Sequence, residues 1–248
     1  MKKYNPRRIV HILLVVCAIG ILYSAFFLLS QTREYAAADT AYEAVRQLRE
    51  APPLDEKTAE KQEAAHIDFA SLEEINPEVV AWVAGAEIDY PIVQGKDNAY
   101  YLGHLFSGEA NQLGAIFMDY RNQGDFSDKN TVIYGHNMKN GSMFSSLTAY
   151  KAQDYYDSNP TMMLYMPDNT YQLAFFAGLV IDGNGSVPLE FADAQAFQGY
   201  IDALKKKSTF QSTTTVGTED RIVTLCTCSY EFNNARYALF GKLTPLDP

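Results

Sequence analysis

Three side chains in this sequence have the types and settings that covalent catalysis requires: Cys228, His136 and Arg236. A cysteine attacks as its thiolate, and a free thiol with a pKa near about 8.5 is only partly ionised at neutral pH. An imidazole can accept the thiol proton and later protonate a leaving amine. An arginine is always charged and can stabilise the oxyanion that forms when a carbonyl is attacked. The three residues therefore predict acyl transfer through a cysteine thioester.

The elements that must position these residues are short strands. Residues 221–227 and 237–243 are rich in β-branched and apolar residues, and turn-forming residues occupy 229–234 between them. Cys228 ends the first strand and Arg236 begins the second. If the strands pair as neighbours, both side chains lie at one end of a sheet. His136 follows a third predicted strand, 131–134, and Gly135 allows the chain to turn sharply there.

These stretches carry a resemblance to a known family. The TLCTC motif at 224–228, with Arg236 eight positions after Cys228, resembles the catalytic signature of sortases, the cysteine transpeptidases of Gram-positive bacterial surfaces. The TVIYGHN stretch at 131–137 resembles the strand and loop that deliver the sortase histidine. The NGSMF stretch at 140–144, and Trp82 with IDYPIVQG at 88–95, are similar to the class B branch. The resemblance covers roughly residues 68–244 in the family's order.

The resemblance implies roles for the three residues and a class of partner. Cys228 attacks the carbonyl of a threonine within a C-terminal sorting signal, NPQT-like or related, and His136 protonates the leaving amine. Arg236 stabilises the oxyanion or holds the substrate backbone. An amine of a cell-wall precursor or of a pilin lysine then resolves the thioester. The reaction implies no metal and no other cofactor, and the acidic composition argues against a nucleic-acid partner.

Other residues are predicted to line or support the substrate groove. Tyr134 fits a groove wall, while Thr227 and Ser229 flank the nucleophile. Alternation along a strand places Cys226 on the same side as Cys228, where class B relatives usually carry a small hydroxyl residue, so oxidation of the two thiols is a liability. Asn98 and Asp119 are candidate polar supports, with capping of their own loops as an equal alternative.

Three competing interpretations remain open. A metal site made of Cys226, Cys228 and His136 is conceivable, although the usual CxxC pairs are missing. A cell-wall cysteine peptidase would share the thioester, but such enzymes carry cysteine before histidine, and here His136 precedes Cys228 by 92 residues. A non-enzymatic barrel that binds surface proteins would leave the three residues without a joint purpose.

The strand pattern predicts a mainly β fold, a closed sortase-like barrel of about eight strands with peripheral helices. Short strands separated by turn residues favour such a barrel, and they are expected at 79–84, 87–93, 114–118, 130–134, 161–166, 171–181, 222–227 and 237–243. Helices are expected at 144–155 and at 193–206. Ser71 and Glu74 have the spacing of a capping box, which predicts a short helix there that leads into the strand at 79–83.

Composition limits the class of protein. The chain has 248 residues, is 47% hydrophobic and carries a formal charge of −10. Four basic residues precede an apolar N-terminal run. The rest of the chain has 16 basic and 30 acidic residues, and this excess of negative charge is unfavourable for phosphate binding. Of the three cysteines, Cys17 lies in the apolar run, and Cys226 and Cys228 are too close for an unstrained bridge. A disulfide scaffold is thus excluded.

The N-terminal region predicts a membrane anchor. Residues 9–29 include one ionisable side chain, His11, and are long enough to cross a hydrocarbon layer of about 30 Å. A cleaved signal peptide is the alternative. Basic residues at 2, 3, 7 and 8 place the N-terminus in the cytoplasm and the rest outside. The expected organisation is a cytoplasmic tail (1–8), a transmembrane helix (9–30), a helical stalk (31–67) and a catalytic domain (68–248), with an amphipathic helix at 32–49 ended by Pro52-Pro53 and a charged segment at 54–65.

Overall fold

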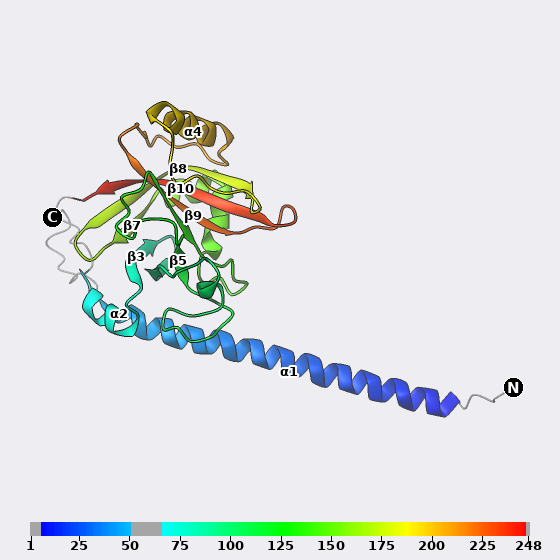
Figure 1. Ribbon diagram of the computed structural model, residues 1–248. Helices are drawn as coiled ribbons and strands as arrows, with labels where there is room; N and C mark the ends of the chain where they lie inside the picture. Colours follow the sequence, from blue (N-terminus) through cyan, green and yellow to red (C-terminus); the bar gives the residue numbers. More distant parts are fainter. Residues whose placement is uncertain (1–5, 51–65, 247–248) are drawn as a thin grey trace. The chain divides into compact units, whose positions relative to one another are not determined.

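The computed structural model describes residues 6–50 and 66–246 (Figure 1). The chain divides into two compact units, Met1–Thr40 and Ala41–Pro248, each described by itself. Pro52-Pro53, the predicted charged segment at 54–65, Lys2 and Lys3 lie outside the described residues.

A single long helix, α1 (Pro6–Arg46), begins the described chain. Its stretch Val10–Arg46 is long and apolar enough to cross a membrane, and a signal sequence meets the same criterion. The separate amphipathic helix expected at 32–49 is instead the end of α1. Its predicted apolar positions Tyr42 and Val45 are buried, and the Tyr42 hydroxyl donates to the Gly114 carbonyl at 3.0 Å.

The second unit is built around a closed barrel of eight strands in the order β10-β8-β7-β3-β4-β5-β6-β9, which confirms the predicted fold class. The strands are β3 (Val79–Gly85), β4 (Ile88–Val93), β5 (Ile116–Met118), β6 (Asn130–Tyr134), β7 (Thr161–Tyr165), β8 (Thr170–Asp182), β9 (Arg221–Cys228) and β10 (Ala235–Pro245). Neighbours are antiparallel except for two parallel pairs, β4 with β5 and β6 with β9. A further two-stranded sheet pairs β1 (Arg49–Glu50) with β2 (His66–Ile67).

The outer face of three barrel strands is covered by helix α4 (Ala194–Lys207), which lies over β8 and β10 in Figure 1. Asp193 begins this helix by accepting the Ala196 N–H at 2.8 Å. Its apolar face packs on Phe176, Ala238 and Phe240 through Phe197, Ile201 and Leu204. This confirms the helix predicted at 193–206, and it means that both faces of β8, β9 and β10 are buried.

Two helix predictions need correction. The helix at 144–155 is two short pieces, η2 (Ser145–Lys151) and α3 (Gln153–Ser158), because Ala152 between them is extended. Helix α2 (Phe69–Ile75) is capped by Asp68, whose carboxylate accepts the Ser71 N–H at 3.0 Å. The short helix is present as predicted, but Ser71 lies within its first turn and is not the capping residue, so the capping-box prediction is wrong. A short η1 (Tyr100–Leu102) follows β4.

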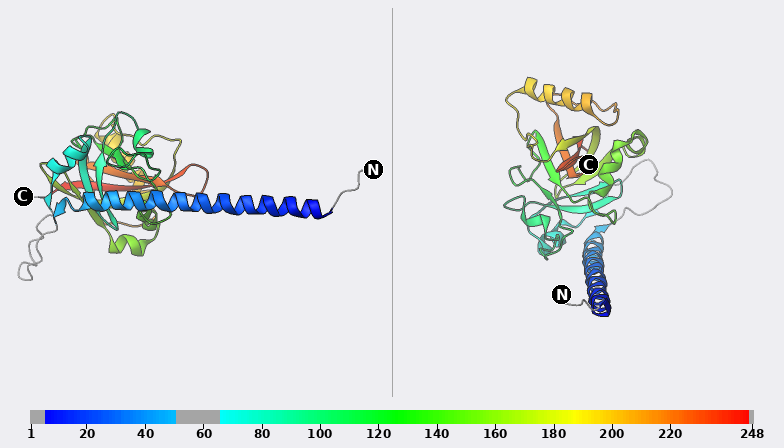
Figure 2. Two further views of the ribbon diagram at one scale, coloured as in Figure 1. Left: turned by 90° about the horizontal axis from the view of Figure 1, so that it is seen from below. Right: turned by 90° about the vertical axis from the view of Figure 1, so that its right-hand side faces the viewer.

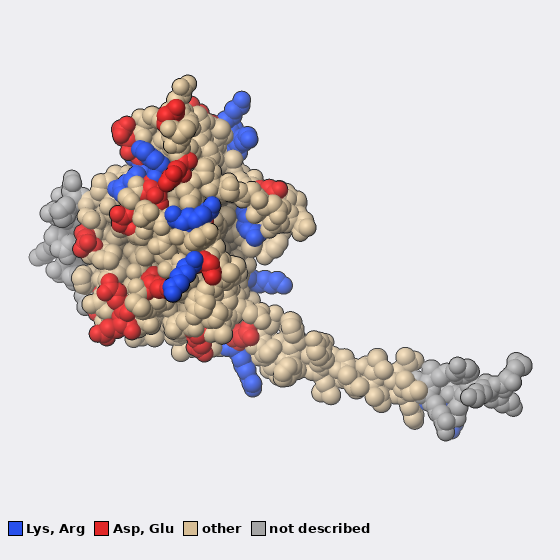
Figure 3. Space-filling model, in the orientation of Figure 1, with Lys and Arg blue, Asp and Glu red and all other residues tan. Residues whose placement is uncertain are grey.

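Charges of both signs are distributed over the barrel. On the face shown in Figure 3, lysines and arginines lie singly among aspartates and glutamates. No continuous basic area is visible on this face, which agrees with the acidic composition. Figure 2 shows the same barrel from two further directions.

Candidate active site

Cys228 and Arg236 are direct partners on the neighbouring strands β9 and β10, as predicted. The Ser229 N–H donates to the Ala235 carbonyl at 2.9 Å, so the backbone bonds flank this pair and do not join it. In such a non-hydrogen-bonded pair the Cα atoms lie about 4.5 Å apart and the side chains approach most closely. The guanidinium thus emerges beside the half-buried thiol.

The charge of Arg236 is not neutralised by an acidic neighbour. Among the described residues it has no carboxylate within ion-pair distance, and Glu231, a possible partner, pairs with Lys151. The Arg236 side chain donates one hydrogen bond, from Nη1 to the carbonyl of Ala235 at 3.3 Å. Most donors of its planar fork therefore remain free to bind a substrate oxygen.

The parallel pairing of β6 with β9 brings His136 to the end of the barrel where Cys228 lies. Ile133 is level with Leu225 and Tyr134 with Cys226. The pairing ends there, so His136 follows the end of β6 two residues later at the same end of the barrel as Cys228, although the two are 92 positions apart in the sequence. A strand-end histidine, a strand-end cysteine and the first arginine of a third strand thus meet at one end of the barrel.

A backbone carbonyl fixes the orientation of the imidazole. Nε2 of His136 lies 2.8 Å from the Leu102 carbonyl oxygen at the end of η1. A carbonyl only accepts hydrogen bonds, so Nε2 is the donor, and we assign the neutral ring to the tautomer with its proton on Nε2. Nδ1 then carries the free lone pair and is the ring nitrogen that can act as a base.

Cys226 differs sharply from Cys228 in its surroundings. Cys226 is 4% exposed, and burial raises the pKa of its thiol to about 12, with Arg236 acting in the opposite direction and Cys228 in the same one. It therefore stays a neutral thiol at neutral pH. A buried, neutral thiol of this kind is not suited to act as a nucleophile.

Tyr134 and Asn98 converge on one buried carboxylate, that of Asp119. The Tyr134 hydroxyl donates to Asp119 Oδ2 at 3.0 Å, and Arg121 forms an ion pair with the same oxygen at 2.7 Å. Burial would raise the pKa of Asp119, but hydrogen bonds from Arg121, Asn98 and Tyr134 hold it below its ordinary value. Burial, together with Asp119, raises the pKa of Tyr134. The phenol thus stays protonated and fixed beside Cys226.

Thr227 and Ser229 support the nucleophile from their buried positions. The Thr227 hydroxyl donates to the Gly135 carbonyl at 2.8 Å, next to His136. The Ser229 hydroxyl donates to the Glu231 carboxylate and accepts from Lys151 Nζ at 2.9 Å. Both side chains are less than 6% exposed, so in this structure they hold the loops of the site together.

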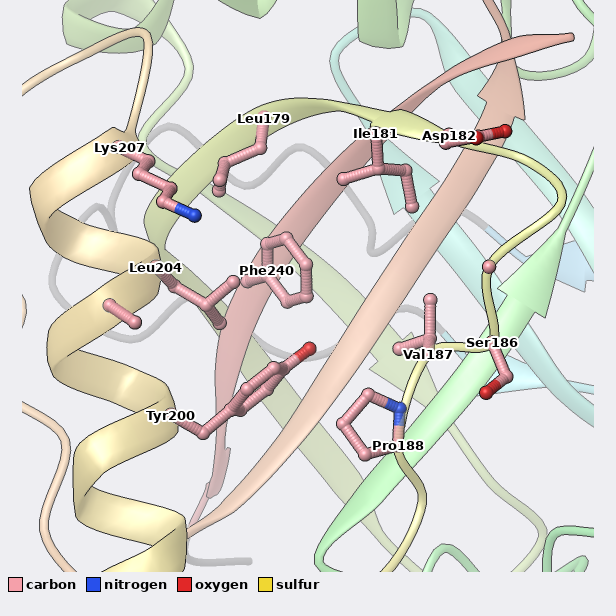
Figure 4. Close-up of a pocket in the computed structure, with 12 residues that line it drawn as sticks. Leu179, Ile181, Asp182, Ser186, Val187, Pro188, Tyr200, Leu204, Lys207 and Phe240 are labelled. Atoms are coloured by element: carbon pink, nitrogen blue, oxygen red, sulfur yellow. The ribbon is translucent and has the colours of Figure 1, made fainter.

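A cavity of about 450 Å³ lies on the same face of the barrel as Cys228 and Arg236. Figure 4 shows Tyr200, Leu204 and Lys207 of α4 on one side and Val187 and Pro188, of the loop between β8 and α4, on the other. Its floor is formed by Leu179 and Ile181 of β8 with Phe240 of β10, and Ile181 is the direct partner of Arg236. The loop after β8 thus has an apolar surface beneath it.

Two features of the site were missed by sequence reasoning. Asn137 donates from Nδ2 to the Cys228 carbonyl at 2.9 Å, and its position directly after His136 was the one available signal. Lys151 reaches Ser229 across 78 positions, and no local pattern indicates such a contact. In the described ranges, 6–50 and 66–246, no group of three or more His, Cys, Asp or Glu is arranged to hold a metal ion.

Comparisons with known proteins place this geometry in context. The family model described as Sortase domain matches residues 83–244. Sortase B of Listeria monocytogenes is 39% identical over 181 residues, which cover 71% of this chain and 74% of that protein. The crystal structure of a Staphylococcus aureus sortase B-substrate complex is 32% identical, with a TM-score of 0.68 over 72% of this chain and 85% of that one. Sortase B of Bacillus anthracis has a TM-score of 0.74 at 29% identity over 87% of this chain and 100% of that one.

Proposed function

Because this chain belongs to the sortase family, in its class B branch, we propose that it is a membrane-anchored cysteine transpeptidase with Cys228 as its nucleophile. The observation that carries the proposal is the double pairing of β9. Its parallel neighbour β6 ends beside Cys226, two residues before His136, and its antiparallel neighbour β10 places Arg236 opposite Cys228.

In the first half of the reaction, Sγ of Cys228 forms a bond to the threonine carbonyl carbon of a sorting signal. The proton of the thiol passes to Nδ1 of His136. The guanidinium of Arg236 binds the oxyanion of the tetrahedral intermediate, a role for which its unpaired donors are suited. When the carbon–nitrogen bond breaks, His136 gives its proton to the leaving amine, and a thioester remains on Cys228.

In the second half, an acceptor amine attacks the thioester and His136 takes its proton. The intermediate collapses with a new amide bond, and the thiolate of Cys228 regains the proton from His136. Every bond that breaks is matched by one that forms, so no oxidant, reductant or nucleotide is required. We propose a cell-wall precursor or a pilin lysine as the source of the amine.

The substrate class rests on family membership. A Staphylococcus aureus relative has been solved as a sortase B-substrate complex, and we propose an NPQT-like or related sorting signal for this chain. Tyr134, Cys226 and the loop after β8 would form walls of its groove, while Asn98, Thr227 and Ser229 hold these walls in place. Helix α1 would anchor the chain, with the basic residues that precede its apolar stretch on the cytoplasmic side.

The deciding experiment is intact-mass spectrometry of the full-length protein in detergent micelles, kept reduced and mixed with NPxT-, SPxT- and LPxT-type peptides. We expect a mass increase equal to the threonine-terminated half of one peptide, absent from Cys228→Ala. No adduct with any peptide, while Cys228 still reacts with a small alkylating agent, would contradict the proposal and favour a binding module. If the adduct disappears at the same rate with and without an added amine, water is the acceptor, and this result would favour a peptidase.

A further inference from the structure

The pairing of β6 with β9 stops one residue before the catalytic histidine. Its last backbone hydrogen bond runs from the Gly135 N–H to the Cys226 carbonyl at 3.1 Å. In a regular parallel ladder, the next two bonds would use the Gly135 carbonyl and the Cys228 carbonyl as acceptors. The chain bends away at this point, which frees His136 from the sheet.

Side chains occupy both of these acceptors. The Thr227 hydroxyl donates to the Gly135 carbonyl at 2.8 Å. Nδ2 of Asn137 donates to the Cys228 carbonyl at 2.9 Å, where the backbone N–H of Asn137 would donate in a continued ladder. The amide of Asn137 thus replaces a backbone group at the residue that carries the nucleophile.

The loop that Asn137 belongs to is closed on itself. The Phe144 N–H donates to the His136 carbonyl at 2.9 Å, and Asn137 forms an isolated bridge with Met143. The Ser145 hydroxyl accepts the Met138 N–H at 2.7 Å. Residues 136–145 therefore form a local unit. The Asn137 side-chain amide connects this unit to the Cys228 backbone through a hydrogen bond.

We propose that Asn137 is a positioning residue, whose side-chain amide ties the histidine loop to the carbonyl of Cys228 and thereby fixes His136 relative to the thiol. The expected effect of Asn137 on kcat rests on the proposed function. It acts through His136 and does not involve contact with the substrate. Loss of the amide leaves the loop closed but removes its hydrogen bond to the nucleophile strand.

The test combines turnover with a measurement that needs no substrate. Asn137→Ala and the nearly isosteric Asn137→Asp, which lacks the donor, are compared with Asn140→Ala in full-length protein. Asn140 lies in the same loop, and its carboxamide oxygen bonds only within the loop, to Ser142. We measure kcat, KM, the thermal midpoint, and the rate at which a small neutral reagent alkylates Cys228 at neutral pH.

We expect both Asn137 variants to lose about 10- to 100-fold in kcat, with KM changed much less, because a small misplacement of a catalytic group affects the chemical step. Alkylation of Cys228 should slow toward the rate of His136→Ala. In a His136→Ala background, Asn137→Asp should have almost no further effect, since it acts through the same ring. Asn140→Ala should behave as wild type.

The proposal would be overturned if Asn137→Asp slowed alkylation of Cys228 equally in the wild-type and His136→Ala backgrounds. It would also be overturned if the single variant Asn137→Asp left kcat and the alkylation rate unchanged. If Asn137→Ala fails to fold, Asn137→Asp decides by the same measurements. Failure of the proposed function is seen separately, as the absence of any acyl-enzyme in wild type. The alkylation cycle still decides the positioning role in that case, because it requires no sorting signal.

Discussion

Arg236 stands opposite Cys228 in the closest kind of pair that two antiparallel strands form, and among the described residues it has no acidic partner. The positive charge of the guanidinium is therefore available to interact with a group that binds at the Cys228 thiol. This relationship is the basis on which we propose a catalytic role for Arg236 instead of a surface ion pair.

Replacing Arg236 should affect chemistry more than folding. We expect Arg236→Ala to reduce kcat about 10²- to 10³-fold, the usual effect of removing an oxyanion donor. Arg236→Lys should recover a small part of this loss, because a lysine keeps the charge but not the planar fork. Steady-state kinetics and thermal melting check both variants, and a fall in melting temperature that accounts for the lost activity would contradict the assignment.

The contact of His136 with the Leu102 carbonyl can be disturbed through Gly114. A Cβ at Gly114 would lie 2.5 Å from the Tyr101 carbonyl oxygen and 3.0 Å from both the Leu102 carbonyl oxygen and His136 Cδ2, at a φ of +62°. We expect Gly114→Ala to lower the free energy of unfolding by about 1–3 kcal/mol and to reduce turnover. Gly103→Ala is the matched control, because nothing lies within 4 Å of its Cβ. Chemical denaturation and kinetics measure both variants, and equal behaviour of the two would refute the prediction.

The two thiols of β9 should react very differently. The burial that raises the pKa of Cys226 to about 12 keeps it neutral and inaccessible, whereas Cys228 is half-buried. We expect iodoacetamide at neutral pH to modify Cys228 and to leave Cys226 intact in the folded protein. Peptide mass mapping distinguishes the sites, and unfolding in denaturant should expose both thiols. Comparable modification of Cys226 in the folded state would show that the wall beneath the nucleophile opens.

The loop after Cys228 should loosen in acid. Hydrogen bonds from Lys151 and Ser229 lower the pKa of Glu231 to about 2, below the value of about 4.3 expected in the unfolded chain. A lowered pKa stabilises the fold above about pH 4.3, and this contribution is lost as the pH falls toward about 2. Its size is at most about 1 kcal/mol, because the pair is partly exposed.

Glu231→Gln tests this pH dependence. The variant should melt below wild type at pH 6, and the difference between the two should shrink toward pH 2.5. Glu219→Gln is the control, because Glu219 is exposed and forms no ion pair with any residue in the ranges 6–50 and 66–246. A constant difference across the range would mean that Glu231 acts through packing and not through its charge.

Much of the barrel could be predicted because its strands have local signatures. The strand expected at 130–134 is β6 to the residue, and most other strand ends fall within one or two positions. Helix details were less predictable. Ser71 resembles a cap, but the Asp68 carboxylate, three residues earlier, accepts its N–H and the helix begins before it. The break at Ala152 also has no marker in the sequence.

The site was predictable to the extent that its residues lie at strand ends near turns. Cys228 and Arg236 belong to one hairpin, so their proximity follows from local pairing. The approach of His136 depends on a parallel pairing between strands distant in the sequence, and only the family resemblance suggested it. The contacts of Lys151 with Ser229 and of Asn98 with Asp119 are tertiary, and strand or helix periodicity contains no information about them.

The parallel pairing of β6 with β9 also has a kinetic consequence. Between these strands the chain must first build β7, β8 and α4, so the loop that closes when they meet is long, and contacts of this kind form slowly. The thiol and the imidazole are therefore separate until the last part of the barrel closes. A chain still emerging during synthesis or export would carry an unassisted cysteine, so reactivity would arise only in molecules that have finished folding.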